Sequence, residues 1–410
     1  MQHALRCAVA LVAGMAIAPQ SPAAAQAPQV NQVRAKTLTA PPAIGSQKNE
    51  TALAKIPERM EQFVADGVIS GAVTLVAHHG EVLQTAAVGK ADIGSDRPMR
   101  TESLFAIASM TKPVTATAMM ILKDEGKLKI DDPVSKYIPE FADATLKGGK
   151  KPSRPITLRD LMTHTAGLGG DQRLEGSLEE TTKALAKRPL DFESGAKWQY
   201  SPGLTVCGRV VEVASGQPFE GFLAERIFEP LGMKDTTFVL TEELQPRRAT
   251  LYKLSENGKE LQPAEHWLNG PAEAKTRGPN PSGGLFSTAS DMGRFYQMVL
   301  NGGELDGKRI VSKESVEEMT SVQTPDLTTG FTPGNGWGLG WCVVREPQGV
   351  TEMLSPGSFG HGGAFGTQGW IDSERKMIFV LMIQRAGLPN SDASDMRKEF
   401  QRLAAEAVTK

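Results

Sequence analysis

The chain has 410 residues, of which 40% are hydrophobic and 22% are charged, and its formal net charge is -2. This length can support a large hydrophobic core, in one big domain or in two interlocked domains. The balanced charge lacks the basic field that nucleic-acid binding requires, so we expect no nucleic-acid partner.

Residues 1–25 have the composition of a secretory signal peptide. Arg6 precedes a short apolar stretch from Ala8 to Ala18, and small residues follow. This order predicts cleavage near Ala25 and a periplasmic or secreted location. The apolar stretch is shorter than the roughly 20 residues of a membrane span, so we expect no stable membrane anchor. Residues 26–50 are rich in Pro, Ala, Gln and Thr, which predicts a flexible lead.

The next segments alternate between helical and strand patterns. The pattern predicts a helix over 50–66, two strands within 71–89 that are joined by a turn at His79-Gly80, and a helix over 109–127. From 130 to about 300 the pattern is mostly helical. Glycines predict the ends of two of these helices, at Gly167 and at Gly216.

Strand character returns near the end of the chain. Segments 336–344, 365–372 and 376–384 are rich in strand-forming residues, and a helix over 391–408 is predicted to close the chain. Strands at both ends with helices between them predict an α+β fold.

This arrangement predicts a discontinuous domain organisation. We expect a sheet domain built from 51–105 and 300–410, a helical domain over 106–299, and an active site at their interface.

The two cysteines outside the predicted signal peptide and the histidines do not indicate a metal centre. Cys207 and Cys342 fall in apolar segments and are predicted to be buried. The six histidines are scattered without the spacing of zinc ligands, so we expect no metal and no cofactor.

A serine and a lysine three residues apart open an apolar helical segment at Ser109 and Lys112. This spacing places both side chains on one helix face, where a lysine of lowered pKa can take the serine proton. The alternative is an N-cap serine with a lysine that extends to solvent. Ser194-Lys197 and Ser373-Lys376 share the spacing but lie in a polar loop and a predicted hairpin turn.

Two other stretches carry candidate groups. Tyr200 in "WQYSPG" precedes a predicted helix, and a tyrosine near an active lysine can relay a proton. "SFGHGGAFG" places His361 and nearby glycines at the start of a predicted strand, where backbone N–H groups can stabilise an oxyanion. The alternatives are a half-buried tyrosine and a flexible loop with a surface histidine.

Together and in this order, the stretches "LFAIASMTKPVTA", "LMTHTAGL", "WQYSPG", "GGLFSTASDMGRF" and "HGG" resemble the serine β-lactamase/penicillin-binding-protein superfamily. Within it, the chain is similar to class C β-lactamases and to family VIII carboxylesterases. The resemblance covers about residues 55–405. It implies a β-lactamase-like fold, with an antiparallel five-stranded sheet flanked by helices and a mostly helical inserted domain.

The resemblance also implies roles for single residues. It makes Ser109 the acylated nucleophile, Lys112 its base and Tyr200 the proton shuttle. The backbone N–H groups of Ser109 and Ala364 would form the oxyanion hole. The substrate-binding positions that it implies are Pro202, His361, Gly362 and Gly363.

Two departures from the family pattern favour one substrate class. Pro202 replaces an asparagine that helps to bind β-lactam side chains, and proline offers no donor. His361 replaces a lysine that helps to hold a substrate carboxylate, and histidine is mostly neutral near pH 7. These changes favour a secreted serine hydrolase that cleaves small-molecule carboxylic esters through a Ser109 acyl-enzyme.

Two alternatives remain open. The first is an amide hydrolase: a β-lactamase, a D-Ala-D-Ala carboxypeptidase or a D-aminopeptidase. The second is a catalytically inactive binding or scaffolding protein of the same fold. No Gly-x-Ser-x-Gly motif is present, which disfavours an α/β-hydrolase. The sequence does not predict the oligomeric state.

Overall fold

The structure is a computed structural model that describes residues 49–170, 176–265 and 278–408. The predicted signal peptide and the predicted lead up to residue 48 lie outside the described residues. Within the described ranges, no helix combines the length and the apolar character needed to cross a membrane.

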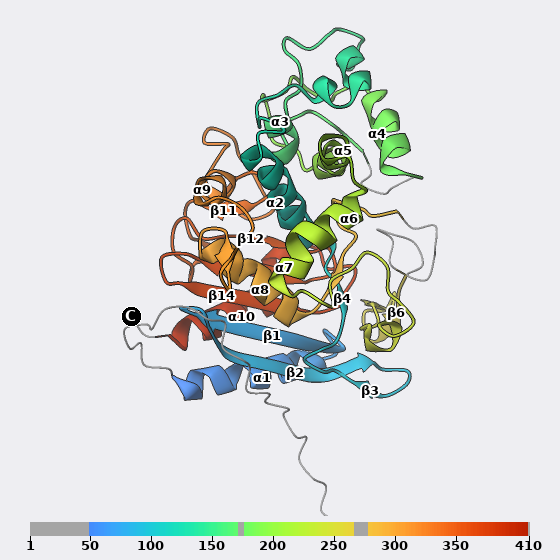
Figure 1. The fold of residues 1–410 in the computed structure, drawn as a ribbon. Helices are drawn as coiled ribbons and strands as arrows, with labels where there is room; N and C mark the ends of the chain where they lie inside the picture. Colours follow the sequence, from blue (N-terminus) through green and yellow to red (C-terminus); the bar gives the residue numbers. More distant parts are fainter. Residues whose placement is uncertain (1–48, 171–175, 266–277, 409–410) are drawn as a thin grey trace, which may run out of the picture. The chain divides into compact units, whose positions relative to one another are not determined.

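An antiparallel sheet of eight strands lies at the centre of the described chain (Figure 1). Its strands in spatial order are β10 (Asn335–Trp337), β11 (Cys342–Val344), β12 (Phe359–Gly362), β13 (Gln368–Asp372), β14 (Met377–Met382), β1 (Gly71–His78), β2 (Glu81–Asp92) and β3 (Arg97–Pro98). The α+β class is confirmed, but the strand number of five is wrong. Segment 336–344, which is predicted to be rich in strand, covers β11 and most of β10, whereas β3 has two residues, too few for a sequence period to reveal it.

Both faces of the sheet are covered by helices. Helices α1 (Glu50–Ala65) and α10 (Asp395–Glu406) lie on one face, and α8 (Ala289–Leu300) lies on the other (Figure 1). Side chains alternate along β1: Val73 and Leu75 belong to the core on the α8 side, whereas Ala72 and Val76 pack with α1 and α10. Burial on both faces explains the nearly continuous apolar run of β1.

The segments between β3 and β10 supply most of the other helices. They are α2 (Thr111–Asp124), α3 (Leu158–Met162), α4 (Leu178–Ala186), α5 (Gly203–Ser215), α6 (Phe219–Leu223), α7 (Glu229–Leu231) and α9 (Lys313–Thr320). Three pairs of short strands also form here: β4 (Phe105–Ala106) with β7 (Phe286–Ser287), β5 (Tyr252–Leu254) with β6 (Leu261–Pro263), and β8 (Glu304–Leu305) with β9 (Lys308–Arg309). The segment is therefore less uniformly helical than its pattern predicts.

Two predicted helix ends have different outcomes. Helix α5 ends before Gly216, whose φ of 75° gives the left-handed C-cap that the glycine predicts. Helix α3 ends at Met162, well before Gly167, so that prediction is wrong. His164 adopts a left-handed φ of 60°, which is incompatible with a continuing helix.

The predicted burial of the two cysteines is confirmed. Cys207 lies in α5 and Cys342 lies in β11, and both are buried free thiols.

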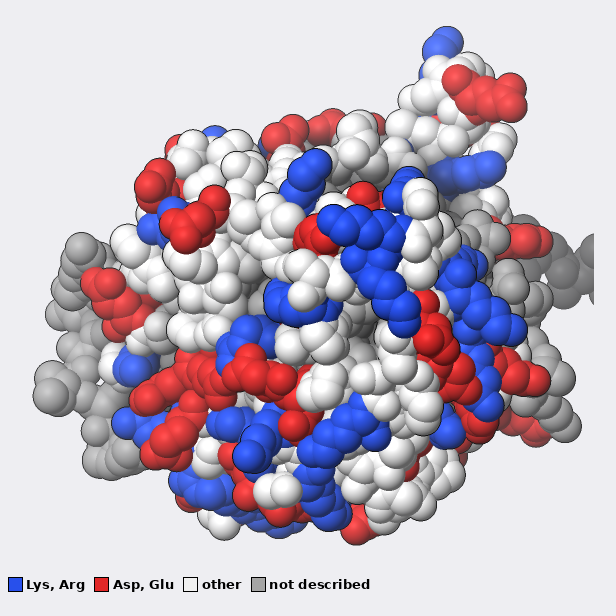
Figure 2. Space-filling view, turned by 90° about the horizontal axis from the view of Figure 1, so that it is seen from above, with Lys and Arg blue, Asp and Glu red and all other residues white. Residues whose placement is uncertain are grey.

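On the face shown in Figure 2, basic and acidic side chains are interspersed.

Candidate active site

Ser109 lies in a single 3₁₀ turn, η1 (Ala108–Met110), which leads directly into α2. Its neighbour Ala108 has a left-handed φ of 45°, a conformation that costs free energy for a residue with a Cβ. Such strain is typical of functional sites, and no sequence pattern indicates it at an alanine. The strained turn leaves Ser109 half-buried, whereas Ala108 and Met110 on either side are buried.

Lys112 is fully buried, and its Nζ lies 3.1 Å from Ser109 Oγ. Nζ also donates a hydrogen bond of 2.6 Å to the carbonyl oxygen of Ser282. Burial holds the pKa of Lys112 well below its usual range, because the ammonium loses its hydration. A neutral amine at this distance can accept the proton of the Ser109 hydroxyl.

The start of α2 is fixed by a Pro/Gly-rich segment at 280–285. Thr111 Oγ1 accepts a hydrogen bond from the Leu285 amide at 3.2 Å, and Thr115 donates to the Pro281 carbonyl at 2.7 Å. The sequence predicts only a connection here, because proline and glycine indicate turns and not partners. The segment therefore places the Ser282 carbonyl beside Lys112, a contact that sequence reasoning missed.

Tyr200 lies in the loop before α5, and its ring centroid is 4.6 Å from Lys112 Nζ. Burial raises the pKa of the Tyr200 hydroxyl, because the phenolate is disfavoured, while a polar contact from Ser109 acts in the opposite direction. Tyr200 is therefore a neutral phenol that can give and take a proton in turn. The structure brings Ser109, Lys112 and Tyr200 together, and their catalytic roles stay predictions.

Aromatic side chains surround Tyr200. The ring of Phe331 lies 4.9 Å from the Tyr200 ring and 5.9 Å from the ring of Trp198. Trp337 lies 6.1 Å from the Tyr200 ring and is buried. Phe331 is 44% exposed, so it extends this aromatic group to the surface.

His361 lies in β12, inside the sheet between β11 and β13, and is 2% exposed. The alternative of a flexible loop with a surface histidine is therefore excluded: "SFGHGG" contributes a strand of its own ahead of the predicted strand over 365–372, and its glycines conceal that strand in the sequence. His361 Nδ1 lies 2.7 Å from the Gly362 carbonyl oxygen, so Nδ1 carries the proton. Burial and the nearby Lys112 lower the pKa of His361 to about 3, which makes it neutral at pH 7.

The glycines after His361 permit close packing against η1. A Cβ on Gly363 would lie 2.5 Å from the Ile107 carbonyl oxygen, and a Cβ on Gly362 would lie 1.8 Å from an Asp392 carboxylate oxygen. A side chain at Gly363 would push β12 away from the residue before the turn that carries Ser109, and a side chain at Gly362 would displace Asp392.

The two backbone amides expected to form the oxyanion hole have compatible surroundings. Across the part of the chain that the structure describes, neither the Ser109 N–H nor the Ala364 N–H donates to a protein acceptor. An oxyanion requires N–H donors that are not already bound to a protein acceptor, and both amides meet this requirement.

Pro202 takes a structural position at the start of α5. It is the N-cap residue, it is buried, and its carbonyl accepts the Thr205 amide at 2.9 Å. Its assignment to substrate binding stays a prediction.

The other two Ser-x-x-Lys matches do not form comparable sites. Ser194 donates to the Ala166 carbonyl at 3.2 Å, while Lys197 is exposed. Ser373 and Lys376 lie in the turn that joins β13 to β14.

A buried lysine lies beside a half-buried serine at a helix start, with a tyrosine ring over the amine, and this arrangement is typical of a serine hydrolase. A family model described as Beta-lactamase matches residues 56–404. The chain therefore belongs to the beta-lactamase family, as the sequence motifs predict.

Several known proteins are similar to the chain over most of its length. Esterase EstB of Burkholderia gladioli is 31% identical over 367 residues, which cover 81% of this chain and 90% of EstB. Penicillin-binding protein 4 of Amycolatopsis lactamdurans is 32% identical over 318 residues, which cover 76% and 79% of the two chains. The solved structure of EstCE1, a hydrolase with promiscuous acyltransferase activity, has a TM-score of 0.75 and 26% identity, covering 88% of this chain and 99% of EstCE1.

Proposed function

We propose that this serine hydrolase cleaves carboxylic esters through an acyl-enzyme on Ser109. The observation that carries the proposal is the state of His361. Where the family resemblance implies a cation for a substrate carboxylate, this chain has a buried imidazole with a pKa of about 3. A neutral ring does not attract an anionic substrate, so substrates without that carboxylate fit the site better.

In the first step, the Ser109 hydroxyl gives its proton to the neutral Lys112 amine 3.1 Å away. Oγ then attacks the ester carbonyl carbon, and the carbonyl oxygen becomes an oxyanion. In this proposal the Ser109 and Ala364 amides donate hydrogen bonds to that oxygen and stabilise its charge.

Release of the alcohol requires a proton on its oxygen. Lys112 holds the proton taken from Ser109, and the Tyr200 hydroxyl can pass it on because the phenol gives one proton as it receives another. The C–O bond then breaks, and an acyl group remains on Ser109. In the second half of the reaction a water molecule attacks the acyl carbon, and the same groups take its proton. The bond between the acyl carbon and Ser109 Oγ then breaks, Oγ regains a proton, and the carboxylic acid leaves.

The similarity to EstB, which is named as an esterase, supports the same substrate class. Pro202 supports it too, because its ring has no donor for the amide of a β-lactam side chain. We also propose that the small-molecule substrate binds at an interface between two domains. Ser109 and Tyr200 come from the predicted helical domain 106–299, and His361 comes from the sheet domain.

The location of the enzyme stays a proposal from the N-terminal sequence. The charged, apolar and small-residue order of residues 1–25 supports export and a periplasmic or secreted enzyme.

A direct comparison of two substrates tests the ester preference. We expect kcat/KM for p-nitrophenyl butyrate to exceed that for a chromogenic cephalosporin by at least about tenfold, which is about 1.4 kcal/mol of transition-state stabilisation. Ser109→Ala should abolish both activities, which shows that they share one site. Equal kcat/KM values for the two substrates would contradict the proposed preference. Absence of turnover and of fluorophosphonate labelling would favour a scaffolding protein.

A further inference from the structure

His164 contacts Tyr200 and both of the residues beside it. The Gln199 amide donates to the His164 carbonyl at 2.9 Å, and the Ser201 amide donates to His164 Nδ1 at 3.1 Å. The imidazole ring itself packs on the ring of Tyr200, with centroids 4.5 Å apart. A single residue therefore binds the backbone on both sides of Tyr200 and also contacts its side chain.

These contacts fix the protonation state of His164. Because Nδ1 accepts the Ser201 N–H, the neutral ring carries its proton on Nε2. Burial, Lys112 and His361 keep the pKa of His164 well below its usual range, so the ring stays neutral. Only the neutral form can accept the Ser201 amide, so burial preserves the contact.

The position of His164 is costly to the fold. Its side chain is fully buried, its φ is 60°, and its Nε2 has no partner in the described part of the chain. A left-handed backbone and an orphan buried donor each destabilise the native state. A costly arrangement beside a reacting group calls for an explanation other than packing.

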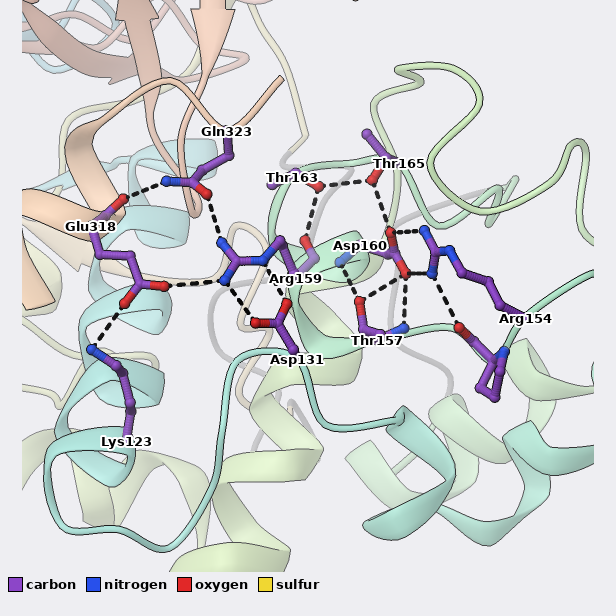
Figure 3. A network of polar contacts seen from close by, with 11 residues as sticks. Lys123, Asp131, Arg154, Thr157, Arg159, Asp160, Thr163, Thr165, Glu318 and Gln323 are labelled. Carbon is purple, nitrogen blue, oxygen red and sulfur yellow. Dashed lines mark hydrogen bonds and ion pairs between the residues drawn. The ribbon is translucent and has the colours of Figure 1, made fainter. Parts of the chain in front are cut away.

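A polar network supports the turn that carries His164 (Figure 3). Arg154 donates two hydrogen bonds to the Asp160 carboxylate, at 2.6 and 2.8 Å. The Thr165 amide donates to the Asp160 carbonyl at 2.9 Å, and the Thr163 and Thr165 hydroxyls lie 2.8 Å apart. Hydrogen bonds thus hold the residues on both sides of His164, and they limit the movement of the turn.

We propose that His164 is a positioning residue that holds the Tyr200 hydroxyl at the correct place relative to Ser109 and Lys112. This inference rests on the proposed proton-transfer role of Tyr200. His164 itself touches no reacting atom, and its effect passes through the loop 199–201. Displacement of a proton-transfer group by about 1 Å can lower a rate by about a hundredfold.

The substitution His164→Asn isolates this role. Asparagine tolerates a left-handed φ and offers a carboxamide oxygen to the Ser201 amide, but it lacks the ring that packs on Tyr200. We expect kcat to fall by about tenfold to a hundredfold, with KM changed by less than about threefold. His79→Asn is the matched control, since His79 has a φ of 50° in the exposed β1–β2 turn. It should leave kcat within about twofold of the wild type.

A double-mutant cycle separates positioning from a general structural effect. If His164 acts through Tyr200, His164→Asn should change kcat by less than about threefold in a Tyr200→Phe background. If the two losses of kcat multiply in the double variant, the proposal is overturned. His164→Asn would then lower kcat by the same factor with Tyr200 and with Phe at that position, as a general loss of folded enzyme does. Wild-type kcat in the His164→Asn single variant would overturn it as well.

The same cycle can be run without an ester. The second-order rate of Ser109 labelling by a fluorophosphonate reports activation of the nucleophile alone, and the positioning role predicts the same non-additive pattern in that rate. If the fluorophosphonate labels Ser109 but the enzyme turns over no ester, the proposed function is contradicted. The labelling rates of the four variants then test the positioning role of His164 by themselves. Additive labelling losses with normal ester turnover would contradict only the inference.

Discussion

Replacing Lys112 with methionine is expected to lower kcat for ester hydrolysis by about a thousandfold, the middle of the range for loss of a general base. The reason is the 3.1 Å separation of Nζ from Ser109 Oγ, together with burial that favours the neutral amine. Methionine has a similar length, and burial already disfavours the ammonium, so the variant should remain folded. Steady-state kinetics with p-nitrophenyl butyrate measures the effect, and circular dichroism verifies the fold.

Lys123→Met is the matched control for this prediction. Lys123 lies on the same helix and pairs with Glu318 at 2.9 Å, away from the site, so its removal should leave kcat unchanged. In the wild type, kcat/KM should rise with pH as Lys112 loses its proton, and it should reach its plateau well below the ordinary lysine pKa of 10.5. Turnover by Lys112→Met within tenfold of the wild type would refute the assignment of the base.

Asp160→Asn is expected to lower the free energy of unfolding by about 2–3 kcal/mol, through the loss of charge-assisted hydrogen bonds to a buried carboxylate. The side chain of Asp160 is 6% exposed, and it accepts two hydrogen bonds from Arg154 and one from the Thr157 amide (Figure 3). An asparagine NH₂ would face one of these donors. The Arg154 side chain is 43% exposed, and for this reason we expect less than the full cost of an unpaired buried charge. Urea unfolding measures the change.

Asp131→Asn provides the comparison for Asp160. Asp131 pairs with Arg159 at 2.7 Å, but its side chain is 70% exposed. A solvent-exposed pair contributes about 1 kcal/mol or less. Equal losses of unfolding free energy in the two variants would contradict this prediction. They would show that burial does not determine how much the hydrogen bonds of Asp160 contribute to stability.

The long elements of the fold could be predicted because their signals are local. Helix α1 and strands β1 and β2 lie within a residue or a few of their predicted bounds, since their periods persist over 8 to 16 residues. Strand β3 depends on β2 for its hydrogen bonds, and nothing within its two residues shows that this neighbour exists. The division of segment 336–344 into β10 and β11 likewise depends on the pairing of the two strands.

The site shows the same division between local and long-range information. A helix start singled out Ser109 and Lys112 from three matching pairs, and the family motifs added Tyr200. The roles of the Ser282 carbonyl and of His164 depend on contacts across 170 and 37 residues of sequence. The left-handed φ of His164 is set by the turn around it; histidine adopts this conformation more often than most residues, but most histidines do not adopt it, so the residue type alone does not predict it.

The proposed ester hydrolysis depends above all on covalent chemistry at Ser109. Mass spectrometry of the enzyme quenched during turnover of a slowly hydrolysed ester tests this most directly, with peptide mapping of the modified residue. We predict an added mass equal to the acyl group, located on Ser109 and absent from Ser109→Ala. An acyl group on another residue, or turnover that survives in Ser109→Ala, would contradict the proposal.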